Sequence, residues 1–185
     1  SGSESYTNTR GIDDVTAYVT ESSENVYDIK IYSPCPIYAP KNCSSLFYNV
    51  ANMTSLVFNN FNTKYATTMY SMFSRCSSLT ELDLSGFDTS SVDTFSSMFS
   101  NCSKLKTLNL SSFNTSKGEK MSSMFSYCSN LETLDVTSFD TSNVTTMDWL
   151  FSSCPVLQAP DVSKFDTSSV TEMSAMFYGC KGFTS

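Results

Sequence analysis

The sequence predicts an α/β solenoid, with a parallel β-sheet on its concave side, short helical segments on its convex side and an N-terminal β-hairpin cap. The first observation behind this prediction is a 26-residue repeat, because residues 121–146 are nearly the same as 69–94, 95–120 and 147–172. A fixed period of about 20–50 residues is the signature of units that bury their apolar faces against their neighbours. The second observation is that two hydrophobic periods alternate within every unit.

Each unit is predicted to contain a strand, a turn and a short helical segment. The stretch from Leu131 to Val136 ends in the alternation of a strand, whereas the apolar residues between Val144 and Cys154 follow the spacing of one helical face. Asp140 lies between them and can accept backbone N–H bonds at the turn. Successive strands would pair in parallel about 4.8 Å apart. The expected core residues of one unit are Met121, Met124, Phe125, Cys128, Leu131, Leu134, Val136, Phe139 and Val144.

The N-terminal part is predicted to cover the open end of the repeat core. Residues 1–14 are polar and are expected to form a loose tail, beginning with a cloning remnant at residues 1–3. Residues 15–20 and 26–31 are predicted to form the hairpin, and the second of these strands also belongs to a degenerate first coil. The predicted domains are 1–42 (tail, cap hairpin and first coil) and 43–185 (solenoid), with repeats 43–68, 69–94, 95–120, 121–146, 147–172 and a partial repeat 173–185 that we expect to be followed by more.

The composition argues against several classes of function. The net charge is −7 and no basic stripe is present, which argues against nucleic-acid binding and against attraction to anionic lipid. No apolar run approaches the ~18 residues of a membrane helix. Histidine, the commonest general base and metal ligand, is absent from the sequence, and so are phosphate-loop and nucleophile motifs. We therefore expect no enzyme, no cofactor and no metal site.

The cysteines fall into two groups. Five of the seven are one repeat apart, from Cys76 to Cys180. One ligand per unit makes a line instead of the four-ligand cluster that zinc needs, so we interpret these five as small apolar core residues. Cys35 and Cys43 lie outside this row, and a disulfide between them is a candidate if the protein is exported, with two thiols as the alternative.

A row of polar residues is predicted to point outward from the strands. Its centre is the acidic series Asp83, Asp135 and Asp161, with Asn109 at the equivalent position in one unit. A flat row of single carboxylates does not converge on a calcium ion, which needs about six or more oxygen ligands. We interpret the row as a ligand surface, and a solvated sheet face is the alternative. The predicted binding residues are Glu81, Asp83, Ser85, Thr107, Asn109, Ser111, Thr133, Asp135, Thr137, Asp161 and Ser163.

A second polar row and three single departures complete the pattern. Asn or Asp followed by Thr recurs at each turn, as at Asp140, and is interpreted as structural. Trp149 stands where other units have Ser or Ala, so it is a candidate interaction hot spot, with packing on a neighbour as the alternative. Pro160 replaces an inward Leu and removes one ladder donor, and Gly118 replaces a Val of the helical segment.

The repeat resembles two known patterns. Its Leu-x-x-Leu-x-Leu half resembles the strand of leucine-rich repeats. The fuller pattern, from Met98-Phe through Cys102 to Phe113-Asn-Thr-Ser, resembles the BspA-like bacterial surface repeat, over about residues 43–180. The resemblance implies a leucine-rich-repeat fold, a bacterial cell-surface location and, as in some members, adhesion to host matrix proteins. It implies no catalytic residues.

These observations predict a non-enzymatic, secreted or surface-bound leucine-rich-repeat binding module. Its expected role is that of an adhesin, and its expected partner is an extracellular host or matrix protein or a glycan, without nucleic acid and without insertion of this fragment into a membrane. The alternative is a purely structural spacer that projects another domain from the cell. A third hypothesis makes the segment the targeting arm of a catalytic protein. Fold-level analogy alone does not decide among these roles.

Overall fold

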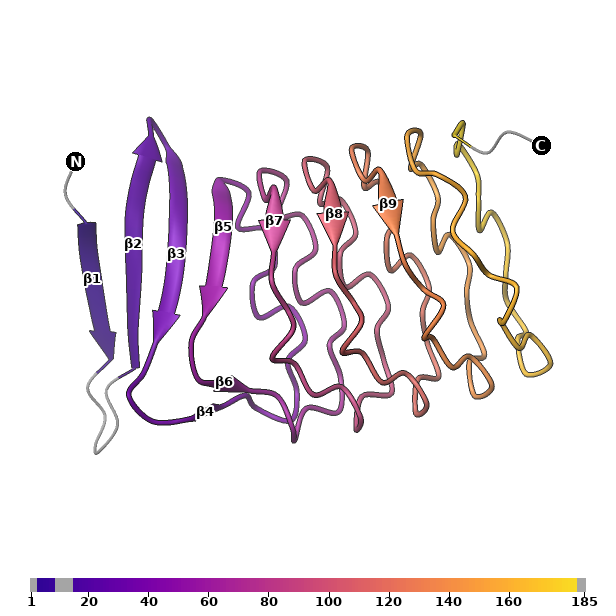
Figure 1. Cartoon of the computed structure of the whole chain (residues 1–185), viewed down its shortest axis with the longest axis horizontal. Coiled ribbons are helices and arrows are strands. Elements are labelled where there is room, and N and C mark those ends of the chain that lie inside the picture. The colour runs from indigo at the N-terminus through magenta and orange to yellow at the C-terminus, as the bar shows by residue number, and fades with distance from the viewer. Residues whose placement is uncertain (1–2, 9–14, 183–185) are drawn as a thin grey trace.

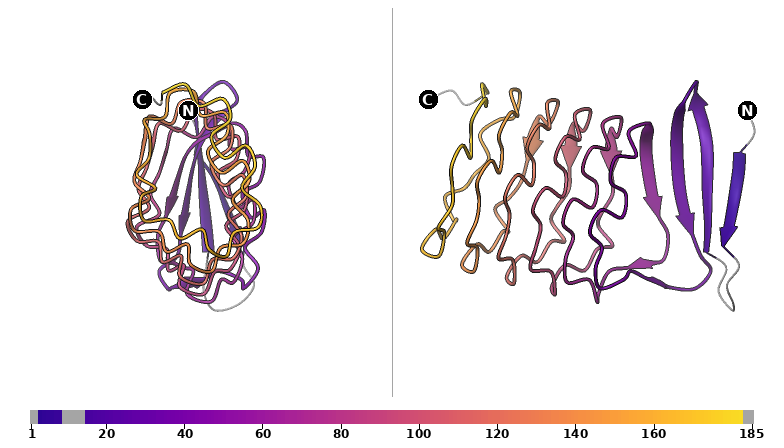
Figure 2. Two further views of the ribbon diagram at one scale, coloured as in Figure 1. Left: turned by 90° about the vertical axis from the view of Figure 1, so that its right-hand side faces the viewer. Right: turned by 180° about the vertical axis from the view of Figure 1, so that it is seen from behind.

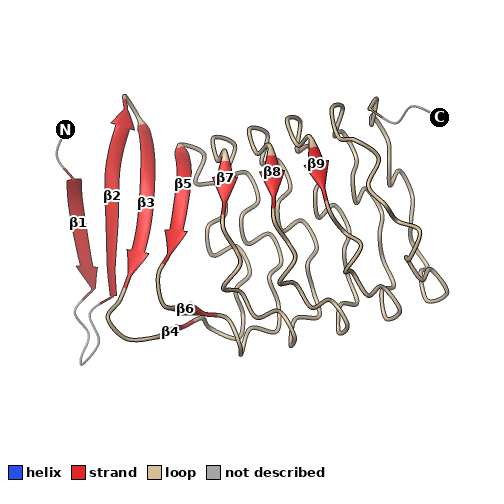
Figure 3. Cartoon of the chain, viewed as in Figure 1, coloured by secondary structure: helices blue, strands red, loops and turns tan. Residues whose placement is uncertain are grey.

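Residues 3–8 and 15–182 are described by the computed structural model, and within them the chain forms nine β-strands and no helix (Figures 1 and 3). The first three strands are long, and most of the later ones have two residues. The strands are β1 (Ser3–Asn8), β2 (Val15–Ser23), β3 (Val26–Tyr32), β4 (Ile37–Tyr38), β5 (Met53–Phe58), β6 (Phe61–Asn62), β7 (Glu81–Leu82), β8 (Thr107–Leu108) and β9 (Thr133–Leu134).

One mixed sheet of five strands begins the chain, in the order β1-β2-β3-β5-β7. Strands β1, β2 and β3 pair antiparallel, and β3, β5 and β7 pair in parallel. The pairing of β2 with β3 agrees with the hairpin expected over 15–31. The expectation of a loose tail is wrong for residues 3–8, which form β1, while residues 9–14 of that tail lie outside the described residues.

Beyond this sheet, backbone contacts recur every 26 residues. Parallel bridges join Thr68 to Thr94, Thr94 to Lys120, and Lys120 to Thr146, with the same offset. Successive units therefore lie side by side, as the side view and the end-on view of Figure 2 show. Two further pairs of short parallel strands, β4 with β6 and β8 with β9, complete the strand pairing of the described chain.

The predicted fold class, an α/β leucine-rich-repeat solenoid with helical segments on its convex side, is wrong. The described chain has no helix, and its strands belong to three small sheets, one of them mixed, instead of one continuous parallel sheet. The strand ladder is interrupted between β7 and β8, and no strand follows β9. Pro160 stands where Leu108 and Leu134 stand in β8 and β9, and since proline has no N–H it cannot extend this ladder.

The segments predicted as helical form consecutive turns because their amide groups alternate between two sets of acceptors. The N–H of Met72 donates to the carbonyl of Met69 within the unit, whereas the N–H of Ser71 donates to the carbonyl of Ser96 in the next unit, at 3.0 Å. An α-helix would direct every N–H to the carbonyl four residues earlier. Ser71 also has φ 52° and Arg75 φ 63°, which helix geometry excludes but which the third position of a type II turn requires. The apolar spacing between Val144 and Cys154, which also fits one face of a helix, is thus produced by turns.

A column of phenylalanines runs through the core along the stacking direction. Successive rings are 5.5–5.7 Å apart at their centroids and 3–9° from parallel. The four inner rings are fully buried, and all nine core residues predicted for the unit 121–146 are buried as well, which confirms that part of the prediction. Aromatic pairs contribute about 0.5–1.5 kcal/mol beyond their buried area, so the column strengthens each junction between units. Its members are Phe47, Phe73, Phe99, Phe125, Phe151 and Phe177.

Buried threonines form a second link between units. The Thr115 hydroxyl, 1% exposed, donates to the carbonyl of Asp140 at 3.0 Å and accepts the N–H of the same residue at 2.8 Å. Thr89 and Thr63 make the same pair of bonds, one and two units earlier respectively. One side chain thus satisfies both backbone groups of a turn residue in the next unit, which supports the structural interpretation of this row.

Candidate binding surface

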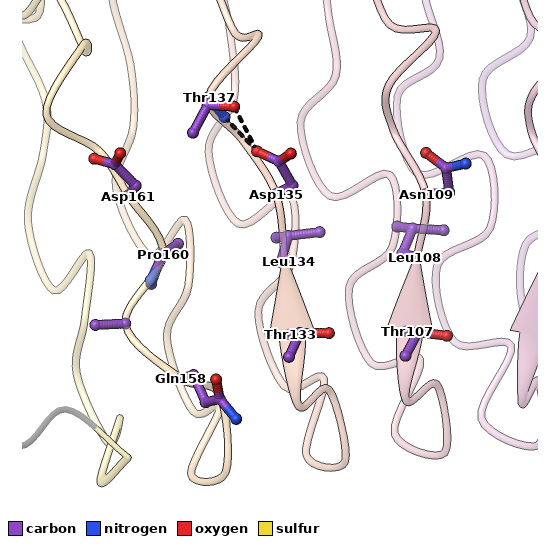
Figure 4. Close-up of a pocket in the computed structure, with 11 residues that line it drawn as sticks. Thr107, Leu108, Asn109, Thr133, Leu134, Asp135, Thr137, Gln158, Pro160 and Asp161 are labelled. Atoms are coloured by element: carbon purple, nitrogen blue, oxygen red, sulfur yellow. Dashed lines mark hydrogen bonds between the residues drawn. The ribbon is translucent and has the colours of Figure 1, made fainter.

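The candidate surface is the exposed side of β5, β7, β8 and β9 together with residues 158–161, and we call it the strand face. Successive strands turn alternate residues outward, so that Thr107 and Thr133 lie next to each other and Asn109 and Asp135 form the row beside them (Figure 4). Leu134 is 7% exposed and forms part of the floor between these rows. The polar rows therefore stand above an apolar strip.

Two open hollows lie along the strand face. The first has a volume of about 550 Å³ and is lined mainly by Thr107, Leu108, Asn109, Thr133, Leu134, Asp135, Thr137, Gln158, Ala159, Pro160 and Asp161. The second, of about 600 Å³, is lined by Ser55, Leu56, Val57, Glu81, Leu82, Asp83, Ser85, Thr107 and Asn109. Thr107 and Asn109 line both hollows, so the two are adjacent and together extend over five units of the chain, from 43–68 to 147–172.

The carboxylates of this face also have a local role. The Asp135 Oδ1 atom accepts the backbone N–H of Thr137 at 2.9 Å and its hydroxyl at 2.7 Å (Figure 4). Asp83 and Asp161 accept the N–H group two residues later in the same way. The hydroxyl and N–H of Thr137 lower the pKa of Asp135, and the N–H of Ser85 lowers that of Asp83. These carboxylates therefore stay charged in mildly acidic as well as neutral solution.

Other side chains of the face make no such internal bond. Within the described part of the chain, the hydroxyls of Thr107 and Thr133 and the carboxylate of Glu81 have no hydrogen-bond partner, and all three residues are exposed. Each strand-face Asp uses Oδ1 for its local bond, which leaves Oδ2 to face solvent. The hollows thus combine an apolar floor with several exposed donors and acceptors, the combination that ligand surfaces use.

Most of the predicted binding residues line these hollows. Ser111 and Ser163 do not, and each donates its backbone N–H to the polar residue two positions earlier. Gln158 and Pro160 line the first hollow but were not predicted as binding residues. Alignment of the repeats could have indicated Pro160, because it stands where Leu108 and Leu134 line the same hollow. It could not have indicated Gln158, because the equivalent Thr80 lines neither hollow.

Trp149 lies outside the strand face, in the turn segment of the unit 147–172. Its side chain is 39% exposed and makes an edge contact with Tyr178, with ring centroids 6.1 Å apart. The φ of Trp149 is 60°, in the left-handed region that favours glycine. Trp149 is therefore exposed, as predicted, and also packs on a neighbouring ring, the alternative considered from the sequence.

Four of the five cysteines of the row are buried, Cys180 is half-buried, and all five donate hydrogen bonds. The Cys128 thiol donates to the carbonyl of Phe99 at 3.2 Å, and the other four thiols of the row make the same contact 29 residues back along the chain. Burial raises the pKa of Cys76 to about 11 and that of Cys154 to about 12. Cys43 is a buried thiol that donates to the carbonyl of Pro40 at 3.1 Å, so the candidate Cys35–Cys43 disulfide is not formed in this structure.

No group of three or more cysteines and carboxylates in residues 3–8 and 15–182 is arranged to hold a metal ion. The same residues include no helix of the length and apolarity needed to cross a membrane.

Comparison with known proteins gives one match. The model of a family described as "Mycoplasma protein of unknown function, DUF285" matches residues 41–134 and, a second time, 120–185. These two segments cover most of the chain and include all the residues of the strand face. No curated protein matches the chain, and no solved structure matches it.

Proposed function

We propose that this chain, which belongs to the DUF285 family, is a non-enzymatic binding module that holds an extracellular protein or glycan partner on its strand face. The observation that carries the proposal is the pair of adjoining hollows along five units, with exposed polar groups above an apolar floor. A surface of this kind can bind an extended partner through many small contacts that repeat from unit to unit. We expect a partner on this face to bury an area typical of a shallow protein–protein interface.

The cell-surface location is part of the same proposal. It rests on the resemblance of the 26-residue repeat, as in Met98-Phe through Cys102, to the BspA-like surface repeat, some members of which adhere to host matrix proteins. The Asp83, Asp135 and Asp161 carboxylates give the strand face a negative charge, since their pKa values are lowered. A partner with a positively charged strip would be attracted to this face.

The test is a binding screen followed by charge variants. The chain would be screened against immobilised matrix proteins and a glycan array, and each partner found would be tested with the Asp83→Asn/Asp135→Asn/Asp161→Asn variant. Asparagine keeps the local turn bond, because Asn109 accepts the N–H of Ser111 at 3.0 Å at the equivalent position. We expect the variant to fold normally and to bind the partner about tenfold or more weakly, as loss of three charge contacts predicts.

The matched control removes the same three charges from another row. Asp88, Asp140 and Asp166 cap the turns in the same way, and Asn114 fills the equivalent position in one unit. The control variant Asp88→Asn/Asp140→Asn/Asp166→Asn should bind the partner as the parent does. Equal weakening by both variants would indicate a non-specific charge effect, and no weakening by the first would exclude the strand face. Absence of any partner in the screen would favour the structural spacer.

A further inference from the structure

The outward row that contains Asp83 continues onto the N-terminal sheet, where its chemistry changes. Tyr18 in β2 pairs with Lys30 in β3, and Lys30 pairs with Val57 in β5 (Figure 1). Val57 lies beside Asp83, because β5 and β7 pair in parallel and both residues line the second hollow. One row therefore runs from an aromatic ring through a lysine and a valine to the acidic series.

Val57 is an exposed apolar residue inside the sheet. It is 49% exposed, although β3 and β7 flank β5 on both sides, so its exposure does not come from an end of the repeat stack. The equivalent positions of later units hold Asp or Asn, from Asp83 onward. Leu56 and Leu82 line the same hollow as Val57. An apolar side chain of a partner would therefore meet three apolar residues there.

On the other side of Val57 the row is acidic. Asp83, Asp135 and Asp161 each use Oδ1 for a local bond, which leaves Oδ2 to face solvent, and Glu81 adds a fourth carboxylate. Among the described residues, no lysine or arginine lines either hollow. Lys164 lies near enough to Asp135 and Asp161 to act on them electrostatically. Four carboxylates against this one lysine leave a negative surface, which is complementary to cationic groups.

The spacing of the row fits an extended polypeptide. Adjacent strands lie about 4.8 Å apart, so Asp83, Asp135 and Asp161 lie about 5, 14 and 19 Å from Val57 along the row. Alternate residues of an extended chain point to the same side, so the second, fourth and sixth residues after an apolar one lie about 7, 13 and 20 Å from it. The flexible stem of a lysine covers the remaining differences of about 2 Å or less.

The two ends of the row also set the kind of partner and its direction. Lysine and arginine give polypeptides the cationic groups that this face requires, whereas the sugar units of most glycans are neutral or acidic. Lys30, on the side of Val57 opposite to Asp83, would repel a basic residue. The basic residues of a partner are therefore expected on the acidic side of its apolar residue only.

We propose that the strand face binds an extended basic segment of a protein, with an apolar side chain beside Val57 in the second hollow and Lys or Arg side chains along Asp83, Asp135 and Asp161. This proposal rests on the proposed function and narrows its partner from a protein or a glycan to a basic polypeptide. A segment of about seven residues spans this part of the row.

The test measures the binding of fluorescein-labelled heptapeptides to the intact chain by fluorescence anisotropy, at low ionic strength because salt screens exposed charges. The probe is Leu-Ser-Lys-Ser-Lys-Ser-Lys, with analogues that carry Phe or Ile in place of Leu and Arg in place of Lys. One control peptide has Ser in place of Leu, and another has Glu in place of every Lys. We expect the probe or an analogue to bind at least fivefold more tightly than the Ser control, and the Glu control not to bind. Absence of binding by the probe and all analogues, or equal binding of the Ser control, would overturn the proposal.

A substitution at Val57 tests the position of the apolar residue. Val57→Asn introduces the residue found at Asn109 and should fold, which circular dichroism would verify. It should remove the preference for Leu over Ser while the basic peptides still bind. The control is Val156→Ser, which removes a valine of 48% exposure that lines neither hollow and introduces the residue found at Ser78. A preference that survives Val57→Asn, or that Val156→Ser also removes, would contradict the placement.

The charge variant tests the acidic side of the row. Asp83→Asn/Asp135→Asn/Asp161→Asn should weaken binding of the probe by about tenfold or more and should keep the preference for Leu over Ser. Peptide binding that this variant leaves unchanged would place the peptide elsewhere on the molecule and refute the proposal.

The glycan array separates a failure of this proposal from a failure of the proposed function. A glycan partner that the charge variant weakens, together with no peptide binding, would refute the basic polypeptide and leave the strand face as a binding surface. Absence of any peptide, protein or glycan partner would refute both.

Discussion

Alkaline solution should unfold this protein because of its row of buried thiols. Cys76, Cys102, Cys128 and Cys154 are fully buried, and burial raises the pKa of each above the ordinary value of 9.0. Above about pH 9 these thiols ionise in the unfolded chain but stay protonated in the folded one. The unfolded state then binds fewer protons, so the free energy of unfolding decreases as pH rises.

The size of the effect follows from the number of thiols. Each contributes a slope of about 1.4 kcal/mol per pH unit between its unfolded and folded pKa values. Four thiols therefore give roughly 5–6 kcal/mol per pH unit from about pH 9, up to the folded pKa of Cys76 near 11. A domain with a stability of about 5–15 kcal/mol would unfold between roughly pH 10 and 12.

The assay is urea unfolding followed by circular dichroism, at half-unit steps from pH 8 to 10.5 with a reductant present. Cys128→Ala removes one of the four ionising thiols, so it should reduce the slope of the free energy of unfolding against pH by about a quarter. Leu131→Ala truncates another fully buried side chain of the same unit and should lower stability at every pH without changing the slope. A free energy of unfolding that does not change between pH 9 and 10.5, or an unchanged slope in Cys128→Ala, would refute the reasoning.

Three further substitutions test the links between units, each by urea unfolding at pH 7. Thr115→Val should lower the free energy of unfolding by about 2–4 kcal/mol because it leaves both backbone groups of Asp140 without their partner, and Thr115→Ser should restore most of it. Phe99→Ala in the middle of the ring column should lower it by about 3–5 kcal/mol, whereas Phe177→Ala, at a 37% exposed end, should have a clearly smaller effect. Ser97→Gly should raise it by roughly 0.5–1 kcal/mol because glycine relieves the positive φ of 57°, and a decrease would show that this φ is not strained.

The buried residues of the repeat could be predicted from the sequence because burial depends on spacing alone. Met124, Cys128 and Leu131 recur at fixed positions, and all are fully buried. The secondary structure could not be predicted in this way, since the same spacing fits a helix and a series of turns. The serine at the position of Ser97, which adopts a positive φ, carries no clear signal, because serine is common both in turns and on helix surfaces.

The candidate site was predictable in part. The outward Asp83 and Asp135 rows follow from strand alternation, and both line the hollows. Their local bonds to the residue two positions later were not predicted for this row, although an Asx turn was expected at the neighbouring Asp140 row. The aromatic contact of Trp149 with Tyr178 depends on which side chains of adjacent units meet, and alignment of the repeats does not determine this.

The links between units also explain where this chain can vary. Three kinds of link join adjacent units. The threonine hydroxyl bonds, such as Thr115 to Asp140, span 25 residues, and the backbone bridges, such as Thr94 to Lys120, span 26. The thiol bonds, such as Cys128 to Phe99, span 29 residues. Insertion or deletion of one residue would break all three registers at once, so the unit length is fixed. Variation is tolerated at exposed positions whose side chains none of these links uses. Trp149 occupies such a position, so it can replace the serine found at Ser97 without changing how the units pack.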